Sequence, residues 1–232
     1  MSLKSFPFLA SLSAAAAGTI AKLAQEAIAN DGRFTLALSG GHTPRTLYEI
    51  LARDYRTKID WQYVHLFWGD ERYVPHDDPA SNYRMVKESL LGGISIPPNN
   101  IHPVPILSNP SDSSDTYSKE IQSLFKNDIP IFDLILLGLG DDGHAASIFP
   151  ATPITKTHEG IVIVTESPVP PQIRISLTMN VLDNARNVFF LVSGKEKTEI
   201  LKAVLAEEGN PDSKYPAARV QPHGKLVWFV AV

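Results

Sequence analysis

The sequence predicts an α/β fold of the Rossmann-like kind, with a mostly parallel sheet and helices on both faces. Short apolar runs alternate with helical patterns along the chain, which is the order of elements typical of parallel strands joined by helices. Runs such as Leu134 to Leu137 are apolar without polar alternation, as expected for strands covered on both faces. We expect one domain over residues 1–232, because this rhythm resumes after each proline-bearing stretch.

Each element follows from its local pattern. Phe8 to Ile28 has apolar residues at helical spacing, interrupted by polar ones, which favours a surface-packed opening helix over an export signal or a membrane span. The expected strands are Phe34–Leu38, Val64–Trp68, Asp133–Leu137, Ile161–Thr165, Ile173–Thr178, Val188–Val192 and Leu226–Val230. The other expected helices are Thr43–Leu51, Asn82–Leu90, Lys195–Glu207 and one after the polar turn Ser108–Ser114.

Composition narrows the function classes. The net charge is -4 with both signs interspersed, so we expect no nucleic-acid or membrane partner, since either would need a basic patch. The chain has no cysteine, which excludes disulfides and thiolate chemistry and fits a cytoplasmic protein. The histidines lack a ligand-like spacing, and no dinucleotide fingerprint is present. We therefore expect no metal and no cofactor, in a monomer or small homo-oligomer.

The loop after the first parallel strand is a candidate anion site. Ligands of open parallel sheets bind beyond the carboxyl ends of the strands, so the loops that end the first three strands should converge. Here Ser39, Gly40, Gly41 and Thr43 precede a helix. Glycines allow close backbone approach, and the free N–H groups at a helix start attract an anion. The same pattern also fits a tight turn in which Thr43 simply caps the helix.

The second loop carries three adjacent charges, Asp70, Glu71 and Arg72, at the end of an apolar strand. Such a triplet is usually a solvated surface turn. Its position at the expected crevice favours a site instead, in which the Arg72 guanidinium binds an oxyanion or phosphate and the two carboxylates orient it.

The third loop, residues 138–144, is the most informative. His144 follows Asp142 and Gly143 on a glycine-rich turn beyond a buried strand. A lone histidine is more often structural than catalytic, yet this position suits a general acid–base group. Asp142 is close enough to orient the imidazole, or it caps a following helix.

Several motifs together resemble the 6-phosphogluconolactonase family. The matching stretches cover nearly the whole chain and are Leu36–Pro44, Phe67–Pro75, Ser81–Met85, Phe132–Pro150, Pro170–Thr178 and Val192–Lys197. His42 stands where many relatives have serine. Ordered motifs at family-like spacing are far more specific than any single one.

The resemblance implies hydrolysis of 6-phospho-D-glucono-1,5-lactone to 6-phosphogluconate in the oxidative pentose phosphate pathway. By resemblance, His144 is the acid–base residue, and Arg174 and Lys195 hold the substrate phosphate together with the 39–43 loop. Two alternatives stay open. The related glucosamine-6-phosphate deaminase and isomerase type needs a carboxylate where this chain has Phe149, and a non-catalytic sugar-phosphate sensor would not need His144.

Overall fold

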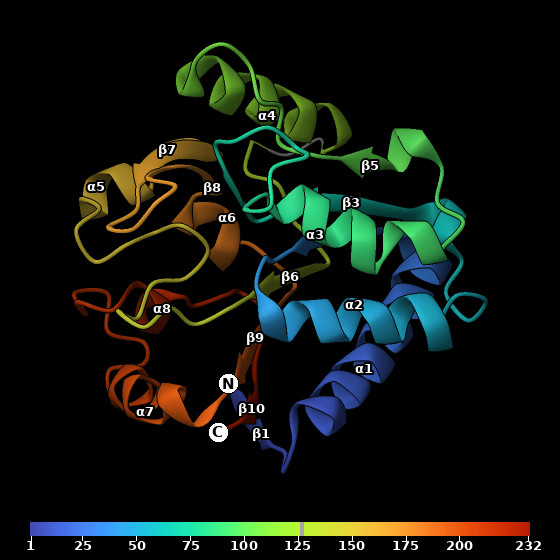
Figure 1. The fold of residues 1–232 in the computed structure, drawn as a ribbon, viewed down its shortest axis with the longest axis horizontal. Coiled ribbons are helices and arrows are strands. Elements are labelled where there is room, and N and C mark those ends of the chain that lie inside the picture. The colour runs from blue at the N-terminus through green and yellow to red at the C-terminus, as the bar shows by residue number, and fades with distance from the viewer. Residues whose placement is uncertain (126–127) are drawn as a thin grey trace.

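The computed structural model describes residues 1–125 and 128–232, and its main element is a seven-stranded sheet (Figure 1). Every strand pair in this sheet is parallel. The strands run in the order β1 (Ser2–Ser5), β10 (Lys225–Ala231), β9 (Asn187–Ser193), β6 (Leu134–Leu137), β2 (Phe34–Leu38), β3 (Val64–Trp68) and β5 (Ile101–His102).

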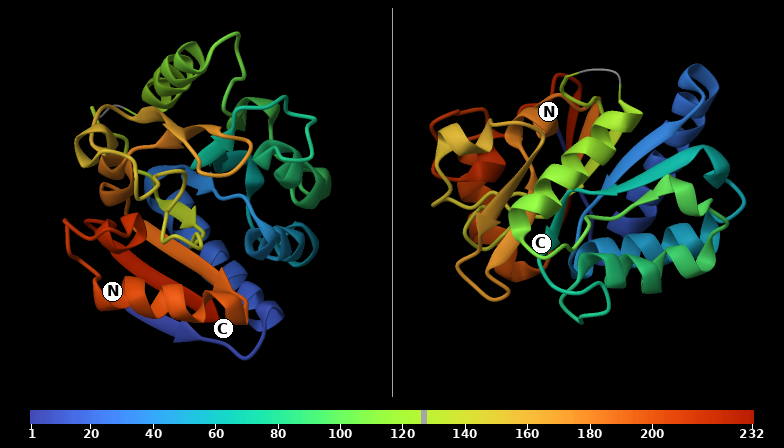
Figure 2. Two further views of the ribbon diagram at one scale, coloured as in Figure 1. Left: turned by 60° about the vertical axis from the view of Figure 1, so that its left-hand side comes forward. Right: turned by 90° about the horizontal axis from the view of Figure 1, so that it is seen from above.

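Helices lie on both faces of this sheet. The larger ones are α1 (Leu9–Asp31), α2 (His42–Asp54), α3 (Asn82–Ser89), α4 (Pro110–Leu124) and α7 (Thr198–Ala206). The connection from β2 to β3 and the one from β9 to β10 run in opposite directions across the sheet. Because such crossovers are right-handed, the helices of these two connections, α2 and α7, must lie on opposite faces. Figure 2 shows α1, which packs on α2, and α7 on opposite sides of β9 and β10. The predicted fold class is confirmed.

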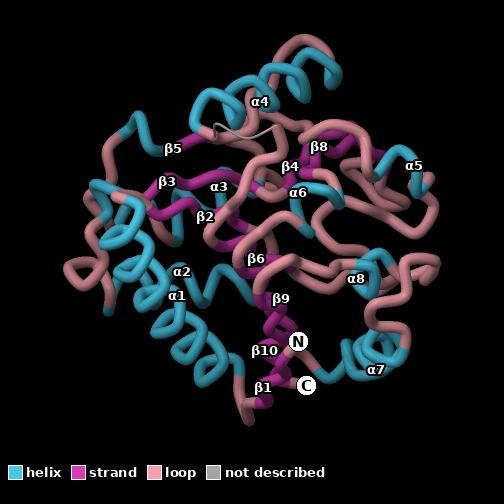
Figure 3. The backbone as a smooth tube through the Cα atoms, turned by 180° about the vertical axis from the view of Figure 1, so that it is seen from behind, coloured by secondary structure: helices cyan, strands magenta, loops and turns pink. Residues whose placement is uncertain are grey.

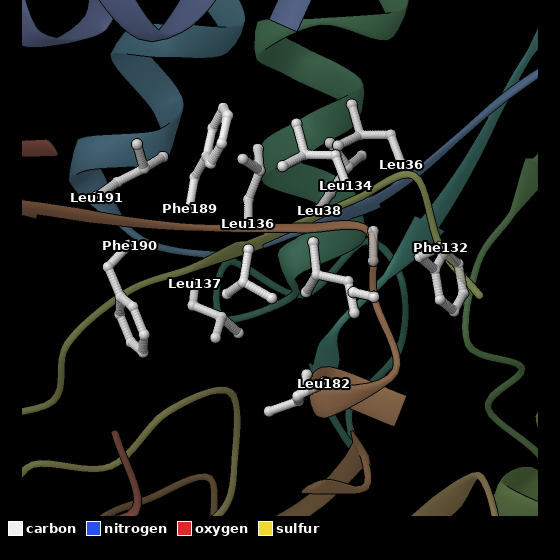
Figure 4. Close-up of a cluster of buried hydrophobic side chains, with 14 of the residues drawn as sticks. Leu36, Leu38, Phe132, Leu134, Leu136, Leu137, Leu182, Phe189, Phe190 and Leu191 are labelled. Carbon is white, nitrogen blue, oxygen red and sulfur yellow. The ribbon is translucent and has the colours of Figure 1, made fainter. Parts of the chain in front are cut away.

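Apolar strands supply both faces with core residues. In Figure 4, Phe189 and Leu191 point toward one face and Phe190 toward the other, which is also the face on which Leu182 lies. All four side chains are buried. Leu182 belongs to α6 (Met179–Asp183), one of the short helices, with α5 (Ile154–Thr157) and α8 (Pro216–Arg219). This burial on both sides explains why the strand sequences lack polar alternation.

The opening helix is confirmed and extends from Leu9 to Asp31. Its buried residues recur every three or four positions and include Leu12, Ala16 and Ile20, so one stripe packs on α2 and the sheet. Gly32 ends it in a left-handed conformation with φ of 73°. Among the described residues, no helix is both long and apolar enough to cross a membrane.

A second sheet departs from the simple strand–helix alternation. It has three antiparallel strands in the order β4 (Asp70–Arg72), β8 (Ile173–Leu177) and β7 (Val162–Glu166). The tube in Figure 3 shows β4 and β8 together, apart from the strands of the main sheet. The strands expected near residues 161 and 173 therefore exist, but they form a hairpin that pairs with β4, and α4 contacts this hairpin.

Candidate active site

A cleft of about 750 Å³ opens at the carboxyl ends of the parallel strands. Strands β2 and β6 are neighbours, and the connections that follow them leave toward opposite faces. Loops diverge at such a point, which is where α/β proteins bind ligands. The predicted site residues that line the cleft are Ser39, Gly40, Gly41, Thr43, Asp70, Arg72, His144, Arg174 and Lys195.

The 39–43 loop is held in place by hydrogen bonds to a buried tyrosine. The hydroxyl of Tyr48 donates to the carbonyl of Ser39 at 2.8 Å and accepts the Ser39 N–H at 2.9 Å. Burial raises the pKa of Tyr48, so the hydroxyl keeps its proton. Gly41 has a φ of 104° and precedes the first residue of α2, a backbone conformation that favours glycine.

Thr43 has a different role from the helix cap considered above. The helix begins at His42, and no side chain caps it. The hydroxyl of Thr43 instead lies 2.6 Å from that of Ser193 at the end of β9. This contact ties the 39–43 loop to a second strand end, and the N–H groups at the start of α2 remain available for an anion.

The 138–144 loop presents His144 with a carboxylate behind it. Asp142 Oδ1 lies 2.6 Å from Nδ1 of His144 and 3.0 Å from the His144 backbone nitrogen. An ionised carboxylate only accepts hydrogen bonds, so this pairing puts the imidazole proton on Nδ1 and leaves Nε2 as an acceptor. Asp142 thus orients the imidazole, and no helix follows that it could cap.

Neighbouring segments hold this loop in place. Gly143 has a φ of 82°, and a Cβ atom there would lie 2.5 Å from the ring of Tyr215. The backbone nitrogen of Ala217 donates to the Gly143 carbonyl at 3.0 Å. Phe149 is buried, and its ring centroid lies 4.7 Å from that of His144.

Two arginines face each other across the small sheet. Arg72 on β4 is the register partner of Arg174 on β8, and like charges at such a position repel. Burial, and then the charge of Arg72, lower the pKa of Arg174. The Arg174 guanidinium donates through Nε to the Pro171 carbonyl at 2.8 Å. The nearby carboxylates of Asp70 and Glu71 act in the opposite direction and raise the pKa of Arg174.

Glu71 differs from the sequence-based expectation. It is 1% exposed and accepts hydrogen bonds from the backbone nitrogens of Arg72, Asn82 and Tyr83 at 2.7 to 2.8 Å. The Arg72 guanidinium instead donates through Nη1 to the carbonyl of Ala80 at 2.6 Å. The expectation that both carboxylates orient this guanidinium is therefore wrong, because Glu71 anchors the start of α3 and the Asp70 carboxylate accepts from Ser147 Oγ instead.

Lys197 is a cleft residue that the sequence analysis did not select. Its Nζ atom donates to the Leu139 carbonyl at 2.8 Å and to Asp141 Oδ1 at 2.5 Å. Lys195, the lysine that was selected, also lines the cleft and is exposed. The two lysines are the first and last residues of one short 3₁₀ helix, Lys195–Lys197. Sequence spacing alone therefore could not show which of them holds the 138–144 loop.

The part of the chain outside residues 126 and 127 brings together no group of three or more metal-ligating side chains. The cleft itself combines a glycine-containing loop at a helix start, two arginines and a histidine paired with a carboxylate. Such a combination is typical of α/β enzymes that act on small phosphorylated molecules.

The chain belongs to the family described as glucosamine-6-phosphate isomerases/6-phosphogluconolactonase, whose model matches residues 9–228. It is 44% identical over 209 residues to a 6-phosphogluconolactonase of Synechocystis, covering 88% of this chain and 85% of the relative. A 6-phosphogluconolactonase of Nostoc is 40% identical over 208 residues, covering 88% of this chain and 84% of the relative. The family and enzyme class predicted from the sequence are confirmed.

The fold is also similar to a solved structure of that enzyme. The crystal structure of 6-phosphogluconolactonase from Thermotoga maritima matches with a TM-score of 0.86 and 32% sequence identity. The match covers 99% of this chain and 98% of that one. The match thus extends over nearly the whole of both chains.

Proposed function

We propose that this chain hydrolyses 6-phospho-D-glucono-1,5-lactone to 6-phospho-D-gluconate in the oxidative pentose phosphate pathway, with water as the nucleophile. The observation that carries the proposal is the 2.6 Å contact between Asp142 Oδ1 and His144 Nδ1 in a cleft that also holds an anion-binding loop. The names of the Synechocystis and Nostoc relatives support the substrate.

In the proposed reaction, Nε2 of His144 takes a proton from water as the water oxygen attacks the lactone carbonyl carbon. The carbonyl oxygen becomes negatively charged, and the Arg72 guanidinium stabilises it. The bond between this carbon and the ring oxygen then breaks, and His144 returns the proton to the ring oxygen. Asp142 stabilises the imidazolium between the two steps through its contact with Nδ1.

The phosphate of the substrate is proposed to bind at the 39–43 loop, with Arg174 and Lys195 as its cations. Gly40 and Gly41 leave the backbone open to the ligand, and Arg174 is held rigidly by its bond to Pro171. A cation that is 7% exposed and faces another arginine gains most from an anionic partner. Asp70 is proposed to contact the sugar.

Phe149 argues against the deaminase and isomerase alternative. That chemistry needs a carboxylate next to the histidine, whereas here an aromatic ring that is 4% exposed packs on the imidazole. A non-catalytic sensor function is supported less well, because binding alone does not require a histidine whose imidazole is paired with a carboxylate.

We further propose that residues 1–232 form one domain, in a cytoplasmic monomer or small homo-oligomer. A single core cluster includes residues of α1, of both sheets and of β10, which supports one cooperative unit. Size-exclusion chromatography, a thermal unfolding scan and cell fractionation test these points.

The decisive experiment measures hydrolysis of freshly generated lactone with a chelator present and the spontaneous rate subtracted. We expect activity in the wild type, none in His144→Ala, and a raised KM in Arg174→Ala. His223→Ala is the matched control, because His223 is exposed and lines a separate cavity. A wild type no faster than background would overturn the proposal.

A further inference from the structure

The carboxylate of Asp70 is held by one hydroxyl. Ser147 Oγ donates to Asp70 Oδ2 at 2.5 Å, and the two residues are 1% and 8% exposed. A carboxylate that is mostly buried needs donors for its charge. Among residues 1–125 and 128–232, no other side chain or backbone nitrogen bonds to this carboxylate, although Asp70 lines the cleft.

Ser147 itself is fixed by the small sheet. Its backbone nitrogen donates to Ser176 Oγ at 3.2 Å, and its carbonyl accepts the hydroxyl of Thr165 at 2.7 Å. Ser176 lies on β8 and Thr165 on β7. The hydroxyl of Ser147 is therefore aimed at Asp70 by its backbone, before any ligand enters.

We propose that Ser147 is a positioning residue that holds Oδ2 of Asp70 and so presents Oδ1 to the cleft as the acceptor for a hydroxyl of the sugar ring. The inference rests on the proposed function, in which Asp70 contacts the sugar. A carboxylate oxygen suits this role, because a polyhydroxylated lactone offers hydroxyl donors and charged acceptors form the stronger hydrogen bonds.

The same bond joins two parts of the site. Ser147 follows the 138–144 loop that carries His144, and Asp70 begins β4. The hydroxyl thereby fixes where the sugar is held relative to the histidine that acts on it. A contact made equally in the substrate complex and the transition state changes KM more than kcat.

A double-mutant cycle tests the proposal in the full-length chain, with Ser147→Ala, Asp70→Ala and the double variant. We expect Ser147→Ala to raise KM for the lactone about tenfold with kcat within about twofold, the size of a hydrogen bond to a charged group. In the Asp70→Ala background the same serine change should leave KM unaltered, because its partner is gone.

Ser114→Ala is the matched control, since Ser114 is 5% exposed and donates to the backbone carbonyl of Val162 rather than to Asp70. It should lower the melting temperature comparably and leave KM unchanged. Ser147→Cys, which keeps a weak donor of similar size, should give an intermediate KM and serves if the alanine variant does not fold.

The outcomes separate the two proposals. An inactive wild type would overturn the proposed function and this inference with it. An active wild type whose KM is unaffected by Ser147→Ala would overturn the inference alone. Equal effects of the serine change with and without Asp70 would do the same, because they would show that Ser147 acts without Asp70.

Discussion

The side-chain amide of Asn82 fills the space in front of Gly40. A Cβ atom at position 40 would lie 1.9 Å from Asn82 Oδ1. Asn82 cannot easily move away, because its Nδ2 atom donates to the backbone carbonyl of Asp70 at 2.8 Å. Glycine at position 40 therefore lets the proposed phosphate loop lie directly against the start of α3.

We expect Gly40→Ala to displace this loop. Overpacking of this kind costs about 1–3 kcal/mol, so the free energy of unfolding should fall by that amount and KM should rise about tenfold. Urea unfolding and steady-state kinetics measure the two effects. Gly92→Ala is the control, because a Cβ atom there meets only the Lys87 carbonyl at 3.7 Å. Equal KM values for both variants would contradict the prediction.

Replacing the carboxylate behind His144 should slow the reaction itself. In Asp142→Asn the amide no longer selects the Nδ1-protonated imidazole or stabilises its charge, so kcat should fall on the order of a hundredfold with little change in KM. Asp115→Asn makes the same substitution at an exposed residue of α4 that does not line the cleft. A similar kcat loss in both variants would show that Asp142 has no special role.

The two lysines of the 3₁₀ turn should separate kinetically. Lys197→Met removes the ammonium that contacts Leu139 and Asp141, so the 138–144 loop should loosen and kcat should fall about tenfold. Lys195→Met leaves those contacts intact and should mainly raise KM. Full kinetic curves for both variants decide the matter, and an unchanged kcat in Lys197→Met would exclude a role in holding the loop.

Glu71 should make stability depend on pH. Burial raises its pKa from 4.5 to about 7, so the folded chain holds a proton there that the unfolded chain releases. The stability from this proton is complete below pH 4.5 and is lost as the pH rises through 7. We expect the loss to be on the order of 3 kcal/mol. Urea unfolding at several pH values should give a flatter profile for Glu71→Gln, and parallel profiles would refute the prediction.

Much of the main sheet could be predicted from local pattern. Phe34–Leu38 and Val64–Trp68 are apolar runs bounded by turn residues, and the structure forms strands over those residues. The convergence of the loops after them follows from the rule that parallel strands end at one edge. These features depend only on residues close in the chain and on a general topology.

The antiparallel sheet could not be predicted in this way. Asp70 pairs with Ser176, and Arg72 with Arg174, across about a hundred residues of sequence. The residues next to Asp70 in the chain contain no signal that identifies such a distant partner strand. Glu71 shows the consequence for a single residue. Its charge is typical of a surface turn, yet its side chain is buried and accepts hydrogen bonds from backbone nitrogens at the start of α3. Lys197 could not be selected for a related reason, because its contact with the carbonyl of Leu139 joins residues that are far apart in the sequence.

The first and last strands of the chain are neighbours, since β1 pairs only with β10 in the described sheet. During synthesis on a ribosome, residues 2–5 emerge early and then wait until residues 225–231 have also left the exit tunnel. The 39–43 loop and α1 can form meanwhile, whereas this edge of the sheet closes only once β10 is available. Until then β1 is an unpaired strand in the nascent chain, and such a strand is a surface that chaperones bind.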